Sequence, residues 1–231
     1  MGRKSSLRRY GGFFAFKVMK NICGIYVVTD QELRSDRGHV EIARCAVEGG
    51  ASIIQIRDKF ASDRDFYTWA VEIRDIIRRN EVLFIVNDRV HIAAAVEADG
   101  VNIGQNDIPI EAARRILDES TIIGVSCSNI AEAQQAVEDG ADYLGFGPVF
   151  TTMTKMDAAP KTGVETLRDV VELSSIPVVA IGGIGASNIV DVLATGVCSA
   201  AVVSAVVCAE DMAQATANLV TQYQNSRKHS H

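Results

Sequence analysis

The chain has 231 residues, of which 48% are hydrophobic and 23% are charged, and its formal net charge is −6 at pH 7. This composition is typical of a globular protein with a large core, and the length fits a single α/β barrel. Residues 1 to 20 hold six basic side chains and no acidic one, which leaves 17 basic against 29 acidic groups, or −12, for the rest. That balance argues against a nucleic-acid partner, and no apolar run reaches the roughly 20 residues of a membrane-spanning helix.

The cysteines and the chain ends set the expected context. The five cysteines form no C-x-x-C pair and stand at no spacing to histidine that indicates a zinc site, so we expect a reducing, cytoplasmic setting. Residues 1–21 are expected to be a poorly ordered basic extension, residues 22–222 the catalytic domain and residues 223–231 a C-terminal tail.

Short runs rich in β-branched residues alternate with longer segments whose apolar residues recur every three or four positions. The predicted strands are 24–28, 52–56, 83–86, 100–103, 122–125, 143–146, 178–181 and 200–203. The predicted helices are 40–47, 66–77, 92–96, 110–117, 130–137, 167–173, 189–193 and 212–220. Eight strands, each followed by a helix, imply a closed (β/α)8 barrel, the TIM barrel. The alternative, an open doubly wound sheet, lacks a G-x-G-x-x-G turn after its first strand.

The segment QIRDK follows the second predicted strand, at the carboxyl end where such barrels have their active-site face. Gln55, Arg57 and Lys59 occupy alternating positions and therefore share one face. An arginine can hold two phosphate oxygens at once and a lysine supplies a mobile charge, so the segment indicates an anion site. The alternative is a set of rim salt bridges to Asp30 or Asp88.

Two acidic residues follow the third and fourth predicted strands, Asp88 in VNDR and Asp107 in GQND. Neighbouring strands bring these side chains within reach of one cation, and two carboxylates with diphosphate oxygens and water are a common way to hold Mg²⁺. Both aspartates also stand where they could cap a helix, which is the alternative interpretation.

Three later segments add polar groups to the same rim. The loop GPVFTTMTK, residues 147–155, ends in Lys155 and is longer than its neighbours, as lids and binding segments often are. IGGI and VVSAV follow the seventh and eighth strands, where such barrels often bind phosphate. Gly183 permits close backbone approach and Ser204 adds a hydroxyl. The rim residues therefore predict two anion sites: QIRDK with the two aspartates and Lys155, and the corner formed by Gly183 and Ser204. An isomerase that acts on a substrate with a single phosphate needs only the second site.

The segments YVVTD, QIRDK, VNDR, DGVNIGQND, IGVSC, GPVFTTMTK, IGGI and VVSAV follow one another across about residues 24 to 207. In this order they resemble the thiamine-phosphate synthase family, whose members join a hydroxymethylpyrimidine diphosphate to a thiazole phosphate, giving thiamine monophosphate and pyrophosphate. The resemblance implies pyrimidine diphosphate contacts from Gln55, Arg57, Lys59, Asn87, Ser126 and Lys155. It implies a thiazole phosphate site formed by Thr152, Thr154, Gly183, Val203 and Ser204. It also implies Mg²⁺ as the cofactor with Asp88 and Asp107 as ligands, and catalytic roles for Arg57, Lys59, Ser126 and Lys155.

Two positions depart from the family pattern: Asn102 stands where the family commonly has His, and Thr151 where it commonly has Pro. Neither is assigned to phosphate or metal, so we expect them to tune the rate. One alternative is a thiazole tautomerase-like isomerase of the same fold, which has little use for the full set of cations and acids. Another is a non-catalytic phosphate-binding barrel. The expected partners are the two phosphorylated small molecules, with no nucleic acid and no membrane, and a homo-oligomer is left open.

Overall fold

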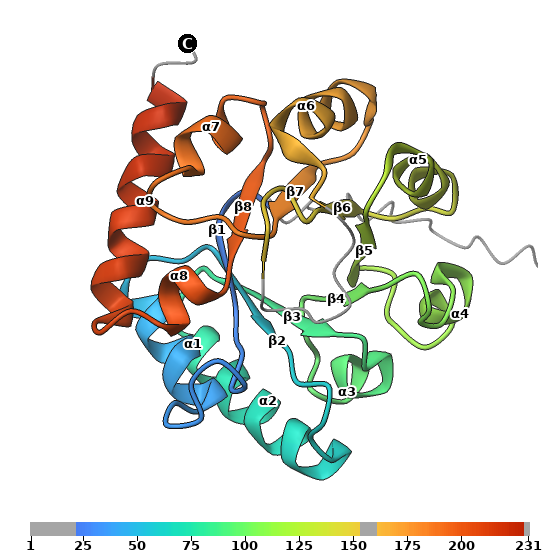
Figure 1. The fold of residues 1–231 in the computed structure, drawn as a ribbon. Coiled ribbons are helices and arrows are strands. Elements are labelled where there is room, and N and C mark those ends of the chain that lie inside the picture. Colours follow the sequence, from blue (N-terminus) through green and yellow to red (C-terminus); the bar gives the residue numbers. More distant parts are fainter. Residues whose placement is uncertain (1–21, 153–160, 229–231) are drawn as a thin grey trace, which may run out of the picture.

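The computed structural model describes residues 22–152 and 161–228, and eight parallel strands within them close into a barrel (Figure 1). The strands are β1 Gly24–Val28, β2 Ile53–Ile56, β3 Leu83–Asn87, β4 Gly100–Ile103, β5 Ile122–Cys127, β6 Tyr143–Phe146, β7 Val178–Ile181 and β8 Ser199–Val202. Each strand pairs with the next, and β8 pairs with β1 so that Tyr26 stands opposite Ala201. The predicted barrel is confirmed, and the open sheet is excluded.

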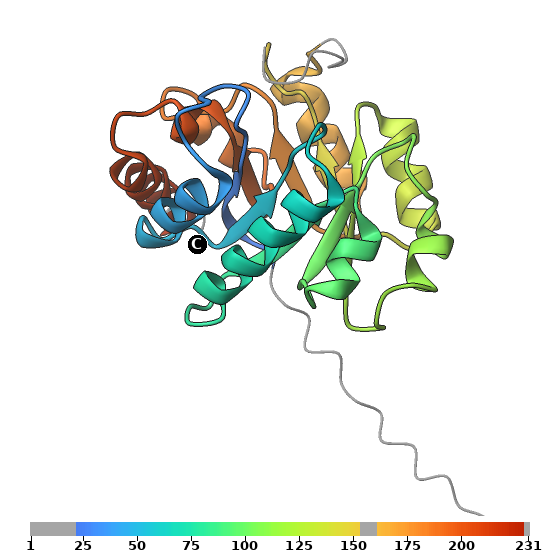
Figure 2. The same ribbon diagram turned by 90° about the horizontal axis from the view of Figure 1, so that it is seen from below.

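Helices surround the barrel on its outer side (Figures 1 and 2). They are α1 His39–Glu48, α2 Asp63–Ile77, α3 Val90–Ala95, α4 Ile110–Arg114, α5 Ile130–Glu138, α6 Gly163–Leu173, α7 Ile189–Leu193, α8 Ser204–Val207 and α9 Met212–Lys228. The eight predicted helices are present, α7 with the predicted ends and each of the others with at least one end shifted. For example, α2 begins at Asp63 rather than at the first apolar residue, because Ser62 caps it by accepting a hydrogen bond from Asp65 N at 3.2 Å. The short α8 was not predicted, since four residues are too few to show a helical period.

The C-terminal segment differs from the predicted tail. Helix α9 continues to Lys228, past residue 222 where the barrel was expected to end. Its last turns contact the chain just before β8: the Tyr223 hydroxyl donates to the Cys198 carbonyl at 3.0 Å, and Arg227 donates to the Val197 carbonyl. Residues 223–228 are therefore part of the folded barrel. The prediction missed them because it followed the spacing of apolar residues, whereas these residues make polar contacts.

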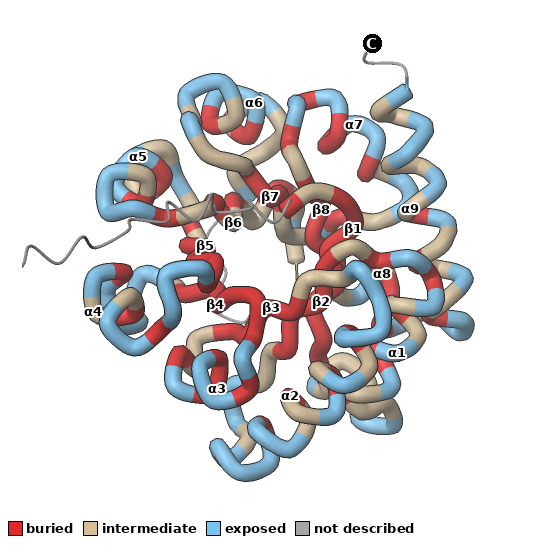
Figure 3. Tube along the Cα trace, turned by 180° about the vertical axis from the view of Figure 1, so that it is seen from behind, coloured by how far each residue is buried: buried red, intermediate tan, exposed pale blue. Residues whose placement is uncertain are grey.

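The core has two layers, which follow from the alternation of side chains along each strand. One set faces into the barrel and includes Tyr26, Ile53, Ile85, Tyr143 and Val179. The larger set packs the strands against the helices. Figure 3 shows the buried positions along the strands and on parts of the helices. A strand buried on both sides leaves mainly its ends for polar chemistry, so most of the predicted functional groups stand at the rim.

A disulfide joins Cys23 to Cys198, the residues directly before β1 and β8, with their Cα atoms 4.7 Å apart. It links the two strands that close the barrel, across 175 residues of sequence. The spacing of the cysteines did not indicate this pair, because only barrel closure brings the two together.

Across the described part of the chain, none of the helices has the length and apolar character needed to cross a membrane.

Candidate active site

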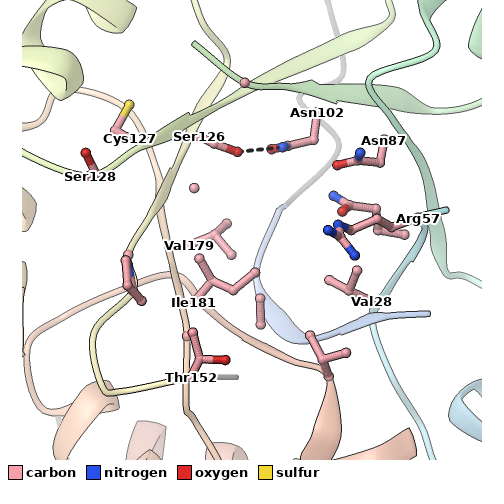
Figure 4. A pocket seen from close by; sticks show the side chains of 18 of the residues that line it. Val28, Arg57, Asn87, Asn102, Ser126, Cys127, Ser128, Thr152, Val179 and Ile181 are labelled. Atoms are coloured by element: carbon pink, nitrogen blue, oxygen red, sulfur yellow. Dashed lines mark hydrogen bonds between the residues drawn. The ribbon is translucent and has the colours of Figure 1, made fainter. Parts of the chain in front are cut away.

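A cavity of about 450 Å³ opens at the carboxyl ends of the strands, a volume typical of a small-molecule site. The predicted site residues that line it are Gln55, Arg57, Lys59, Asn87, Asp88, Asp107, Ser126, Thr152, Gly183, Val203 and Ser204. Thr154 and Lys155 lie outside the described residues. Figure 4 shows Arg57 and Asn87 on one wall, with Thr152 and Ile181 across the cavity from them.

The Arg57 guanidinium is held by Asp30 at the end of β1. Arg57 NH1 lies 3.2 Å from Asp30 Oδ2, and the Asp30 side chain is only 2% exposed. Asp30 Oδ1 accepts hydrogen bonds from the backbone N–H groups of Glu32 and Leu33 at 2.9 and 3.1 Å, which fix the carboxylate. The rim salt bridge considered from the sequence is therefore present. A guanidinium has five N–H donors, so one bond to Asp30 orients Arg57 and leaves donors for a ligand.

Lys59, Asp88 and Asp107 form a second cluster on this wall. Lys59 Nζ lies 3.5 Å from Asp88 Oδ2. Burial raises the pKa of the Asp88 carboxyl, and the charge and hydrogen bond of Asp107 raise it further, while Lys59 opposes the shift. The two carboxylates thus lie close enough to repel each other.

The helix-cap interpretation of the two aspartates is wrong. Helices α3 and α4 begin after Arg89 and Pro109, and neither helix has a side-chain cap. Asp88 instead has a left-handed backbone, with φ of 59°, and Asp107 Oδ2 accepts from Gly104 N at 2.6 Å. Both carboxylates are thereby set at the cavity wall, outside the helices that follow them.

A buried histidine, His39, which the sequence analysis did not identify, contacts Asp58 of the QIRDK segment and Thr29, directly after β1. The Thr29 hydroxyl lies 2.7 Å from His39 Nδ1, and His39 Nε2 lies 3.1 Å from Asp58 Oδ2. Thr29 Oγ1 also accepts from the Arg57 backbone N–H at 3.3 Å. Burial lowers the pKa of His39, although Asp58 opposes the shift, so the neutral ring is favoured. His39 directly precedes the predicted helix 40–47, and this position carried no functional signal.

Two tyrosines, also missed, lie at the inner end of the cavity. Tyr26 on β1 and Tyr143 on β6 both line it, although each is almost fully buried. Their hydroxyls are 3.1 Å apart. Tyr26 stands in the middle of the first predicted strand and Tyr143 begins the sixth, so each was part of an apolar strand pattern. The only available signal was that their side chains point into the barrel, and this direction can be assigned only once the barrel is known to be closed.

The opposite corner of the cavity is shaped by the turn after β7. Gly183 has φ of 65°, and an added Cβ would come within 2.7 Å of the Thr151 backbone oxygen. Asn188 holds this turn, because its Nδ2 donates to the Gly183 carbonyl and its Oδ1 accepts from Gly185 N, both at 2.9 Å. Only glycine fits here, so the corner presents bare backbone next to Val203 and Ser204.

The described residues thus form a closed (β/α)8 barrel whose rim cavity has a wall of cations and carboxylates and a separate glycine-lined corner, an arrangement typical of barrels that bind small molecules at this rim.

Comparison with known proteins gives the family. Residues 25–206 match the family model described as thiamine monophosphate synthase. A thiamine-phosphate synthase of Chloroflexus aurantiacus is 50% identical over 195 residues, which cover 84% of this chain and 90% of that protein. One of Methanospirillum hungatei is 47% identical over 194 residues, or 84% and 94%. The solved thiamine phosphate pyrophosphorylase of Pyrococcus furiosus is 44% identical with a TM-score of 0.83, covering 90% of this chain and 98% of that one.

This chain belongs to the thiamine monophosphate synthase family. The resemblance found in the ordered motifs is confirmed, and the relatives support the synthase rather than the tautomerase-like isomerase or the non-catalytic barrel.

Proposed function

We propose that this chain joins hydroxymethylpyrimidine diphosphate to thiazole phosphate and releases thiamine monophosphate and pyrophosphate. The bond between the pyrimidine methylene carbon and the diphosphate oxygen breaks, and both electrons leave with the oxygen. The lone pair of the thiazole nitrogen then forms the new bond to that carbon. The proposal rests on one observation: a single cavity contains both a wall of cations and carboxylates and a distinct corner of bare backbone. Two anionic substrates need two such places.

The wall formed by Arg57 and Lys59 suits the departing diphosphate. Charge accumulates on the bridging oxygen as its bond to carbon breaks, so cations placed beforehand lower the barrier. Asp30 keeps the Arg57 guanidinium oriented, and it needs no rearrangement when charge develops. Lys59 is paired with Asp88 across 3.5 Å at a partly exposed position and remains mobile enough to turn to a phosphate oxygen. No protein nucleophile is required.

The carboxylate pair fits a divalent cation. Asp88 and Asp107 repel each other, and Mg²⁺ between them and the diphosphate would relieve that repulsion. In the part of the chain that the structure describes, no third acidic, histidine or cysteine side chain joins them. Two carboxylates are sufficient, because Mg²⁺ commonly completes its shell with substrate phosphates and water. When bound, the ion supplies further neutralisation of the leaving diphosphate.

The glycine-lined corner suits the thiazole phosphate. Gly183, Val203 and Ser204 line the cavity and offer backbone and one hydroxyl. Gly183 lies against the backbone oxygen of Thr151, the residue before Thr152. Thr152 lies across the cavity from Arg57 (Figure 4), so a second phosphate bound on the side of Thr152 would not meet the diphosphate. Thr154 and Lys155, which complete the proposed set, follow Thr152 along the same loop.

The test is an assay of the purified full chain with both substrates, with Mg²⁺ and after its removal by a chelator. We expect pyrophosphate and thiamine monophosphate in equal amounts, and a large loss of rate on chelation that added Mg²⁺ restores. Either substrate alone should give no thiamine monophosphate. Absence of thiamine monophosphate at all Mg²⁺ concentrations would refute the proposed reaction. A rate that the chelator leaves unchanged would refute the metal site.

A further inference from the structure

A chain of hydrogen bonds crosses the inner end of the cavity and connects two of the proposed pyrimidine contacts. Gln55 Nε2 donates to the Tyr26 hydroxyl at 2.6 Å, and the Tyr26 and Tyr143 hydroxyls lie 3.1 Å apart. The Tyr143 hydroxyl donates to Asn102 Oδ1 at 3.0 Å, and Asn102 Nδ2 donates to Ser126 Oγ at 2.9 Å (Figure 4 shows this last bond). The chain therefore starts at β2, passes through β1, β6 and β4, and ends at β5.

The fold makes room for this chain at specific places. Tyr26, Tyr143, Gln55 and Asn102 are each at least nine-tenths buried. The Tyr143 ring occupies the space where Gly124 of the neighbouring strand would carry a Cβ. Burial raises the pKa of both tyrosines well above the ordinary range, so both hydroxyls stay protonated and each has one proton to donate.

The single proton on each hydroxyl makes the chain directional. Since Tyr143 gives its proton to Asn102, it can only accept from Tyr26, and Tyr26 in turn can only accept from Gln55. Reversing every bond together is the other arrangement in which all the links survive and each tyrosine proton has an acceptor. A mixed arrangement either sets two lone pairs against each other and breaks a link, or leaves a buried tyrosine proton without an acceptor, and an unsatisfied buried polar group is costly.

The direction determines what the two ends offer to the cavity. In the direction described, Gln55 donates inward, so its Oε1 remains as an acceptor, while Ser126 accepts from Asn102 and keeps its own proton to donate. In the reversed direction Gln55 offers N–H and Ser126 offers lone pairs. In both cases the two ends have opposite hydrogen-bonding roles, and an aminopyrimidine edge carries a donor beside an acceptor.

We propose that Tyr26, Tyr143 and Asn102 are positioning residues that give Gln55 and Ser126 opposite hydrogen-bonding roles toward the ring of the pyrimidine substrate. This inference rests on the proposed function, because it assigns the chain a role toward that substrate. None of the three residues needs to touch the ligand. Asn102, one of the two departures from the family pattern, becomes a link that both accepts and donates.

The test compares two ligands that share a diphosphate and differ in the ring. Tyr26→Phe and Tyr143→Phe each remove one hydroxyl and keep the aromatic volume. Calorimetry on the full chain with Mg²⁺ gives Kd for hydroxymethylpyrimidine diphosphate and for inorganic pyrophosphate. We expect each variant to weaken the first on the order of tenfold and to leave the second unchanged. The double variant should lose little more than either single one, because one broken link already uncouples the ends.

A matched control is Tyr223→Phe. It removes a hydroxyl that is hydrogen-bonded to the Cys198 carbonyl, directly before β8, and Tyr223 does not line the cavity. It should change neither affinity. Equal weakening of both ligands in the Tyr26 and Tyr143 variants would show a merely structural role and overturn the inference, as would fully additive effects. If the unmodified chain bound the pyrimidine diphosphate no more tightly than pyrophosphate, the proposed function would fail together with the inference.

Asn102 provides a second, independent test. Asn102→His keeps one acceptor and one donor, whereas Asn102→Leu removes both at similar size. We expect the histidine variant to retain the preference for the pyrimidine ring over bare pyrophosphate, and the leucine variant to lose it to the same extent as Tyr143→Phe. A leucine variant that retained the full preference would overturn the inference.

Discussion

Opposing electrostatic effects meet at Asp88. Lys59 stabilises its ionised form, while burial and Asp107 favour the protonated form and raise the pKa. A raised pKa in the folded state means that folding favours proton uptake, so this contribution to stability is present below the ordinary pKa of aspartate and is lost as the pH rises through the folded value. At neutral pH the ionised pair therefore opposes folding, which is the expected cost of a site prepared for a cation.

Asp88→Asn should separate activity from stability. The variant keeps the shape of the side chain and removes one charge, so pyrophosphate release should slow on the order of a hundredfold, equivalent to about 3 kcal/mol of transition-state stabilisation. The melting temperature without Mg²⁺ should stay level or rise, because Asp107 loses its repelling neighbour. Asp75→Asn, at an exposed position on α2, is the control. Full activity of Asp88→Asn would contradict the role in metal binding.

His39 should make stability depend on pH. Burial lowers its pKa, so on acidification the unfolded chain takes up a proton at this residue more readily than the folded protein does. The stabilising contribution is thus present above the ordinary histidine pKa and is lost as the pH falls through the depressed value. Melting temperatures measured between pH 7.5 and about pH 5 should fall less steeply in His39→Gln than in the unmodified protein. Equal slopes for His39→Gln and the unmodified protein would contradict the prediction.

At the scale of elements, several hydrogen bonds fix the backbone of the loop between β2 and α2 on either side of Lys59. Asp58 Oδ1 accepts from the N–H groups of Phe60 and Ala61 at 2.8 and 2.7 Å. Arg89, which precedes α3, donates to the carbonyls of Asp58 and Ala61 at 3.2 and 2.6 Å. The loop is therefore tied to its neighbour at several points, and Lys59 lies between the tied positions. This is the arrangement expected of a preorganised electrostatic site.

The loop between β6 and α6 carries the remaining predicted cation. Lys155 lies outside the described residues, so its role stays a prediction from the GPVFTTMTK motif. Lys155→Ala should slow catalysis on the order of a hundredfold, because its ammonium is expected to face the departing pyrophosphate. The melting temperature should not change. Lys161→Ala, an exposed lysine just before α6, is the matched control and should remain active. A normal turnover rate of the Lys155→Ala variant would contradict a role for Lys155 in catalysis.

At the scale of the whole molecule, the contact between β1 and β8 closes the barrel, and the Cys23–Cys198 disulfide, which the expectation of a reducing setting did not include, spans the same junction. A cross-link over 175 residues restricts the unfolded chain strongly, and disulfides of this kind commonly contribute on the order of 3 kcal/mol. Helix α9 covers the same junction through Tyr223 and Arg227. Neither cysteine lines the cavity, so stability and activity should respond separately.

Reduction should therefore lower the melting temperature of the unmodified protein and leave its activity at 25 °C unchanged. Cys198→Ser should melt at the lower temperature with or without reductant. Cys45→Ser, at a free and partly buried cysteine, should keep the response to reductant. Identical melting of the unmodified protein with and without reductant would show that the disulfide does not stabilise the folded state in solution.

The barrel and most of its rim could be predicted without coordinates. Strands of alternating register and helices of three- and four-residue period are local patterns, and eight of each in alternation leave few arrangements. Parallel strands bring their carboxyl ends to one side, so Arg57, Lys59, Asp88, Asp107 and Ser204 could be assigned to a common rim from chain order alone. Helix ends were less predictable, because they depend on caps and on neighbours.

What the sequence by itself determined was therefore the barrel, the family and which polar groups reach the rim, since each of these depends on local period and chain order. Tertiary structure alone decided which groups meet. The Arg57–Asp30 and Lys59–Asp88 pairs were only one of the alternatives that the sequence left open. The bond from Tyr26 to Tyr143 and the Cys23–Cys198 disulfide join residues that only barrel closure brings together. Side-chain register and strand stagger determine such contacts. The same tyrosines that periodicity assigns to an apolar core therefore become, once the barrel is closed, a polar link between two substrate contacts.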